Sequence, residues 1–185
     1  MAKFTHIRSE HETIKEPNEK PKFAHALVLT CIAVAIAVFL ASGHAWNLTA
    51  KIVAEILKAS GVDVNYVAPL YLMYVKVPEG KVVGFQVLVE CSGLLTLVIF
   101  AFLSVFTIGL LRGSLKYKIL WFCLSAGIGF VWNVSRLASI IITANAFGMS
   151  AFTFIHYVLA PTIDFVWVVS AWAIGMTWLR RETKE

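Results

Sequence analysis

Long apolar stretches are the feature that most constrains how this chain can fold. Four stretches are dominated by apolar side chains, namely residues 23–41, 93–111, 119–144 and 157–179. About 20 apolar residues in a helix, at about 1.5 Å per residue, cross a hydrocarbon layer of about 30 Å. With 59% hydrophobic and 15% charged residues, the chain predicts an all-α integral membrane protein, with four transmembrane helices in a single membrane domain spanning residues 23–185.

The segment between the first two spans, residues 42–90, predicts an outer helix and a small β-hairpin. Trp46–Ala59 repeats apolar residues at helical spacing with charged residues opposite, which is typical of a helix at a membrane surface. Leu70–Val77 and Val82–Val89 are rich in β-branched and aromatic residues and are separated by a Pro-Glu-Gly turn signal. The second strand of this hairpin leads directly to Cys91.

Charge distribution predicts the orientation of the chain in the membrane. Residues 1–22 are polar and of mixed sign, which is typical of a cytoplasmic tail. The short loop 112–118 and the end 180–185 are dense in Lys and Arg, and such segments stay in the cytoplasm. Both termini are therefore expected in the cytoplasm, with 42–90 and the predicted loop 145–156 outside.

Three polar residues fall at one level in this topology. Cys91 stands at the outer start of the second span, and His156 at the outer start of the fourth. Arg136 follows Lys118 by about 18 residues, or about 27 Å of helix, which puts it near the same outer interface. Three separate segments thus bring a thiol, an imidazole and a guanidinium to one depth.

These three groups suit nucleophilic catalysis. A thiolate attacks carbonyls, and Cys91 is expected at a helix start that Ser92 caps and whose dipole favours the anion. His156 can move the proton, and Arg136 can hold a developing oxyanion or a substrate carboxylate. The competing interpretations are a packing cysteine, an arginine that anchors the chain at the interface and a histidine without a catalytic part.

Asp164 lies inside the fourth span, eight residues after His156, where charge is costly. It could orient His156 indirectly or neutralise Arg136. A protonated carboxyl group bonded to a neighbouring helix is an equal alternative.

Three segments, in this order, carry a resemblance to a known family. They are Glu90-Cys91-Ser92-Gly93 at the entry of a span, Asn133-Val134-Ser135-Arg136-Leu137 late in a helix, and His156 ahead of the last long span. The chain here resembles the exosortase/archaeosortase family of membrane-embedded cysteine transpeptidases. The resemblance covers roughly residues 82–172.

The resemblance implies a protein-sorting enzyme of the cell membrane. Its substrate would be a secreted protein that ends in a short motif, an apolar helix and a basic tail. Cys91 would cleave near the motif through an acyl-enzyme, Arg136 would stabilise charge, and His156 would act as general base and acid. An acceptor, such as a membrane lipid, would resolve the intermediate. Asn133, one turn before Arg136, would orient it.

Two other functions stay open at this stage. One is a non-enzymatic membrane subunit or chaperone that binds apolar protein tails, and the other is a cysteine-dependent lipid acyltransferase. The sequence predicts no metal site and no organic cofactor, because the cysteines show no metal-ligand spacing. Nucleic-acid binding is not expected, because the basic residues flank apolar spans.

Overall fold

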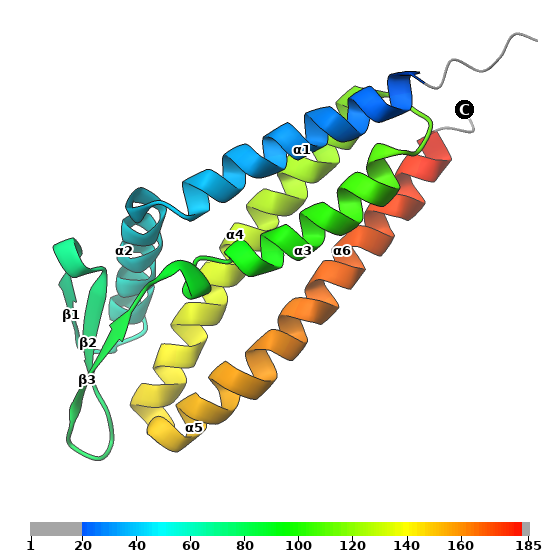
Figure 1. The fold of residues 1–185 in the computed structure, drawn as a ribbon. Coiled ribbons are helices and arrows are strands. Elements are labelled where there is room, and N and C mark those ends of the chain that lie inside the picture. Colours follow the sequence, from blue (N-terminus) through cyan, green and yellow to red (C-terminus); the bar gives the residue numbers. More distant parts are fainter. Residues whose placement is uncertain (1–19, 183–185) are drawn as a thin grey trace, which may run out of the picture.

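The structure is a computed structural model and describes residues 20–182, so the predicted tail 1–22 lies almost wholly outside the described residues. Long helices form a bundle with a small sheet at one end (Figure 1). The bundle helices are α1 (Lys20–Leu40), α3 (Leu94–Ser104) continued by the π-helical turn η3 (Val105–Gly109), α4 (Leu115–Phe147), and a last continuous helix made of α5 (Met149–Phe154), the π-helical turn η4 (Ile155–Leu159) and α6 (Ala160–Glu182).

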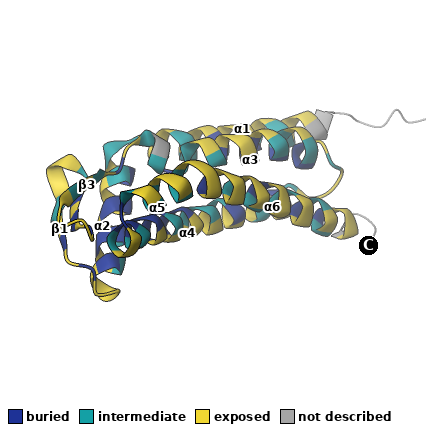
Figure 2. Ribbon diagram, turned by 90° about the horizontal axis from the view of Figure 1, so that it is seen from below, coloured by how far each residue is buried: buried dark blue, intermediate teal, exposed yellow. Residues whose placement is uncertain are grey.

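Three of the described helices are long and apolar enough to cross a membrane, namely Phe23–Leu40, Leu115–Phe147 and Met149–Arg181. The helical stretch Leu94–Gly109 is apolar but shorter. A mostly helical, multi-pass architecture is therefore confirmed, whereas the expected number of four spans is not. Many large apolar residues of these helices are exposed, and Figure 2 colours the exposed outer faces yellow.

The prediction of a loop at residues 145–156 is wrong, because nearly all of this segment is helical. Gly148 alone separates α4 from α5, and its φ of +81° reverses the chain in a conformation that other residues rarely adopt. The apolar residues that follow then continue directly into the last helix. As a result, His156 lies within that helix and not in front of it.

The outer segment forms a helix and a sheet of three strands. The strands β1 (Val64–Val67), β2 (Leu72–Lys76) and β3 (Val82–Gln86) are antiparallel in the order β1-β2-β3, with the 3-10 turn η1 (Ala68–Leu70) between the first two. The predicted hairpin corresponds to β2 and β3, and β1 is an additional strand. It was missed because four residues of mixed polarity give little periodic signal.

The helix α2 (Gly43–Ala59) packs its apolar stripe against protein. Ser42 caps it, with the side-chain oxygen accepting from the Ala45 amide at 3.4 Å. Val53 and Leu57 are fully buried in a core that α2 shares with the inner face of the sheet and with α4. The stripe that suggested a membrane-surface helix therefore serves to hold the sheet onto the bundle.

Lys118, expected in a cationic loop, is a buried residue of α4 with only 1% exposure. Its ammonium group donates to the Gly109 carbonyl (3.0 Å) and the Leu111 carbonyl, and lies 3.2 Å from His25 Nδ1. Carbonyls at a helix end need donors, and a buried Lys satisfies them at the end of η3. This lysine thus ties α1, η3 and α4 together.

The turn η4 widens the last helix just before Pro161. Proline has no main-chain N–H and its ring clashes with the preceding turn, so a wider turn relieves that contact. His156 is the second residue of this widened turn. Its direction relative to α6 is therefore set by the irregularity and not by ordinary helical spacing.

Candidate active site

Cys91 stands in a short 3-10 turn, η2 (Val89–Cys91), which connects β3 to α3. Ser92 follows, 1% exposed, with its hydroxyl donating to the Val89 carbonyl at 2.7 Å. Gly93 is the cap residue of α3 at a φ of +79°, and a side chain there would press on Asn133. The expectation that Ser92 caps the helix is wrong, and Cys91 precedes the helix start by a separate turn.

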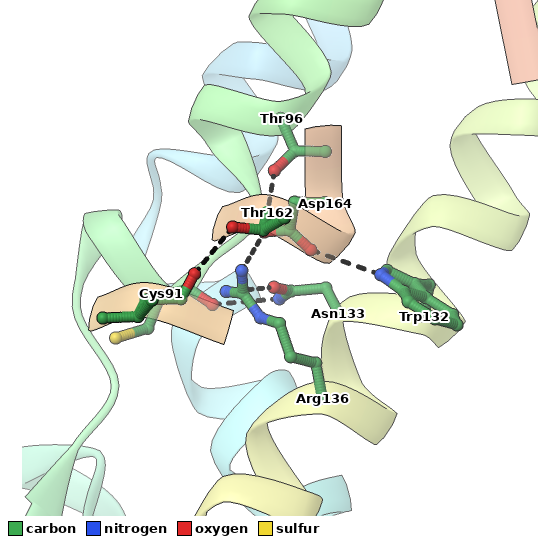
Figure 3. A network of polar contacts seen from close by, with 8 residues as sticks. Cys91, Thr96, Trp132, Asn133, Arg136, Thr162 and Asp164 are labelled. Carbon is green, nitrogen blue, oxygen red and sulfur yellow. Dashed lines mark hydrogen bonds and ion pairs between the residues drawn. The ribbon is translucent and has the colours of Figure 1, made fainter. Parts of the chain in front are cut away.

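Arg136 forms an ion pair with Asp164 across the gap between α4 and α6 (Figure 3). The two side chains are 17% and 13% exposed. Asp164 also accepts from the Trp132 indole at 3.2 Å and from the Thr96 hydroxyl at 3.5 Å. Of the alternatives for Asp164, the structure shows contact with Arg136, at a point where α3, α4 and α6 meet.

Asn133 links the guanidinium group to the main chain of Cys91. Its oxygen accepts from Arg136 Nη2 at 3.0 Å, and its amide nitrogen donates to the Cys91 carbonyl at 2.9 Å. These partners fix the amide orientation, because a guanidinium only donates and a carbonyl only accepts. Figure 3 shows the guanidinium group between Asn133 and Asp164. This hydrogen bond fixes the backbone of Cys91 to α4 at Asn133.

His156 stacks flat on Phe152, with ring centroids 5.2 Å apart and an interplanar angle of 8°, and meets Tyr157 edge-on. The ring is therefore braced by neighbours on its own helix. Among the described residues, no hydrogen bond joins the imidazole to Cys91 or to Asp164. Within the described part of the chain, Asp164 therefore makes no direct hydrogen bond to His156, and an indirect orienting role stays a prediction.

One cavity brings the three predicted residues together. Cys91, Arg136 and His156 all line a space of about 430 Å³ between α3 and α6, whose remaining walls are largely apolar. Within the described part of the chain the Cys91 sulfur makes no hydrogen bond, and Figure 3 draws it on the side away from the guanidinium group. The three groups thus share a pocket, and no hydrogen bond joins any two of them among the described residues.

A second cavity, of about 400 Å³, adjoins the first. It lies among α1, α3 and α4, and its lining is apolar except near Ser92, Asn133 and Asp164. Gly93, Thr96 and Asp164 line both cavities. The first turn of α3 and the Asp164 carboxylate therefore form the wall between two apolar spaces.

Two polar residues of this site were not predicted from the sequence. They are Thr96, which stands in an apolar run, and Trp132, whose indole carries no charge that would mark it as a site residue. Trp132 lies four residues before Arg136, so both face the same side of α4, and this spacing was the available signal. Among the described residues, no group of three His, Cys, Asp or Glu side chains could hold a metal ion.

Comparison with protein families gives one match. A family model described as transmembrane exosortase (Exosortase_EpsH) matches residues 20–173, which is more than four fifths of the chain. The chain belongs to the transmembrane exosortase family. No curated protein and no solved structure matches it significantly.

Membership in the exosortase family fits the multi-pass helical fold and supports a transpeptidase-type role at a membrane. The match runs from the first residue of α1 into α6 and so includes the sheet, the turn that carries Cys91 and the helices that carry Arg136 and His156.

Proposed function

We propose that this exosortase-family protein is a cysteine transpeptidase that cleaves C-terminal sorting signals of secreted proteins and transfers them to a membrane-associated acceptor. The observation that carries the proposal is the common cavity of Cys91, Arg136 and His156. Three segments distant in the sequence contribute these side chains, and the family match supports acyl-transfer chemistry.

In the first half-reaction, His156 takes the thiol proton of Cys91, and the thiolate attacks the carbonyl carbon of the scissile peptide bond. The C–N bond then breaks, and His156 returns the proton to the leaving amine. A thioester remains on Cys91. In the second half-reaction, an acceptor amine, hydroxyl or water attacks the thioester, gives its proton to His156 and releases the Cys91 sulfur.

Arg136 has the donor capacity to stabilise the oxyanion. Its Nη atoms are engaged by Asp164 and Asn133, but its Nε is buried and has no hydrogen-bond partner among the described residues. A buried donor without a partner costs about 1–3 kcal/mol. A substrate oxygen that accepts from this N–H would recover that cost, most strongly when the oxygen carries negative charge.

The test is to trap the intermediate. A secreted protein that ends in a motif, an apolar segment and basic residues is co-expressed, and the acceptor step is slowed by acidic quenching of membranes. We expect mass spectrometry to find a peptidyl thioester on the peptide that contains Cys91. A fatty acyl group on that thiol would instead establish a lipid acyltransferase, and a thiol that is never acylated would contradict acyl transfer.

The proposed orientation puts both termini in the cytoplasm and the cavity near the outer face. The connection from η3 to α4 and the end of α6 lie at the bundle end opposite the sheet (Figure 1). The sequence has Arg112 and Lys116 near this connection and Arg180 and Arg181 at the end of α6, and such cationic segments favour the cytoplasm. In single-cysteine variants, a membrane-impermeant thiol reagent added to intact cells should label Cys91 and spare Cys123. Labelling that requires broken cells would reverse the orientation.

A further inference from the structure

We infer that the free edge of β3 binds the substrate polypeptide. An extended segment ahead of the cleaved bond would pair with this edge as an added strand, which guides the scissile carbonyl to Cys91. The inference rests on the proposed function and deepens it, because it concerns where the substrate main chain binds.

At the far edge of β3, main-chain groups pair with no other strand of the described residues. The Val87 amide donates to the Tyr71 carbonyl at 3.0 Å, so Val87 belongs to the hydrogen-bonded pairs of the β2–β3 ladder. In an antiparallel ladder such pairs alternate with non-bonded ones. The N–H and C=O groups of Val82, Gly84 and Gln86 therefore point away from β2, and all three residues are exposed.

This edge lacks the usual protection against strand pairing. In natural proteins, charged residues, proline, bulges or a very short strand prevent edge strands from pairing with other chains. The sequence of β3, Val-Val-Gly-Phe-Gln, has no charge and no proline. The opposite edge strand β1 has four residues and is followed by Pro69 in η1. Of the two edges of the sheet, the β3 edge is thus the better template.

The position of β3 connects this edge to the cavity. Cys91 follows the end of β3 by five residues, across one 3-10 turn. The Phe85 ring lies 5.3 Å from that of Phe152, and Phe152 stacks on His156. A strand added beside β3 would therefore run next to the helix that bears the imidazole.

The direction of the chain fits a substrate anchored in the membrane. β3 runs from the hairpin tip toward the bundle, and the chain then enters α3 (Figure 1). A substrate whose secreted part is outside and whose apolar segment follows the cleaved bond takes the same course, and so would pair in parallel with β3. Strand addition recognises the main chain, and side-chain pockets at alternate positions supply specificity.

The main test is a backbone scan of a peptide that spans the bond cleaved in the processing assay, with the purified full-length protein in liposomes. Each residue ahead of the bond is N-methylated in turn. We expect kcat/KM to fall by about tenfold or more at every second position, and to change by less than about threefold between them. Equal effects at all positions, with the parent peptide cleaved, would overturn the edge pairing alone. Failure to cleave the parent peptide would contradict the proposed function.

Variants of Gly84 test the same edge from the enzyme side. Gly84→Pro removes an N–H that points away from β2, so the ladder to β2 keeps its bonds. We expect it to raise KM about tenfold. The matched control, Gly84→Ala, keeps the N–H, and its Cβ would lie 3.2–3.3 Å from the movable side-chain ends of Leu72 and Tyr74. It should stay near the wild-type KM.

Because Gly84→Pro can fail to fold, Val82→Pro at the first residue of β3 serves as a second variant, with Val82→Ala as its control. A wild-type KM in folded Gly84→Pro and Val82→Pro would overturn the inference. The oligomeric state in detergent gives a further check. If the wild type is a dimer and Gly84→Pro makes it monomeric without a change in KM, the edge binds a second copy of the chain, and the inference is overturned.

Discussion

Replacement of Cys91 by alanine is expected to abolish processing of a co-expressed secreted substrate, with a loss of at least about a thousandfold in rate. Loss of the nucleophile leaves only binding and the oxyanion site to act on the peptide bond, and these alone give a small residual rate. Cys91 is half-buried in the α3–α6 cavity, and its side chain makes no hydrogen bond within the described residues, so the substitution should not disturb the fold. The fraction of processed substrate over time measures the effect.

Two matched controls separate chemistry from folding. Cys31→Ala removes an exposed thiol on α1 that lines neither cavity. Cys123→Ala removes an exposed thiol on α4 that lines the second cavity but not the α3–α6 cavity. Both should process substrate at the wild-type rate, and all three variants should reach the same membrane content. Processing at the wild-type rate by Cys91→Ala would remove Cys91 from the mechanism.

Single substitutions of the Arg136–Asp164 pair should destabilise the bundle strongly, because the two side chains are only 17% and 13% exposed. Arg136→Gln leaves the Asp164 carboxylate without its cationic partner, and Asp164→Asn leaves the Arg136 guanidinium without its anionic partner. Both groups lie where three helices meet. Breaking a buried ion pair on one side costs about 3–5 kcal/mol. Thermal unfolding in detergent should show this loss, and Asp63→Asn, an exposed acid outside the bundle, should leave the midpoint unchanged.

The double variant Arg136→Gln/Asp164→Asn distinguishes the structural part of Arg136 from its catalytic part. With both charges gone, most of the stability lost in either single variant should return, since neutral groups can hydrogen-bond at less cost. Processing should stay at least about a hundredfold slow, because no guanidinium faces the developing oxyanion. If the double variant is stable and processes substrate at the normal rate, Arg136 has a structural role only, which is to hold the helices together.

The general architecture could be predicted from the sequence because it depends on long apolar runs, which composition reveals directly. The common depth of Cys91, Arg136 and His156 could also be predicted, because helical rise converts sequence separation into depth, whereas their common cavity depends on how the helices pack. Their catalytic roles stay predictions. The expected outer position of the site rests on charge bias alone.

What escaped prediction depends on contacts between distant segments. The buried Lys118 looks like any cytoplasmic cation until the carbonyls of Gly109 and Leu111 are placed beside it. The strand β1 exists because β2 offers it a partner. Likewise, nothing in the local sequence says that Asp164 gathers Thr96 and Trp132 around the guanidinium group.

The widened turn at Ile155–Leu159 has a consequence for how such a chain can diverge between species. Loss of one codon in this stretch would restore regular winding and leave an unbroken hydrophobic helix that still inserts. The helices on either side would keep nearly their present orientation, because the five residues of the π-helical turn cover about the same rotation as four residues of an α-helix. Side chains within the turn, among them His156, would change direction while Asp164 in α6 kept its own. Such a deletion would therefore alter the site without unfolding the protein.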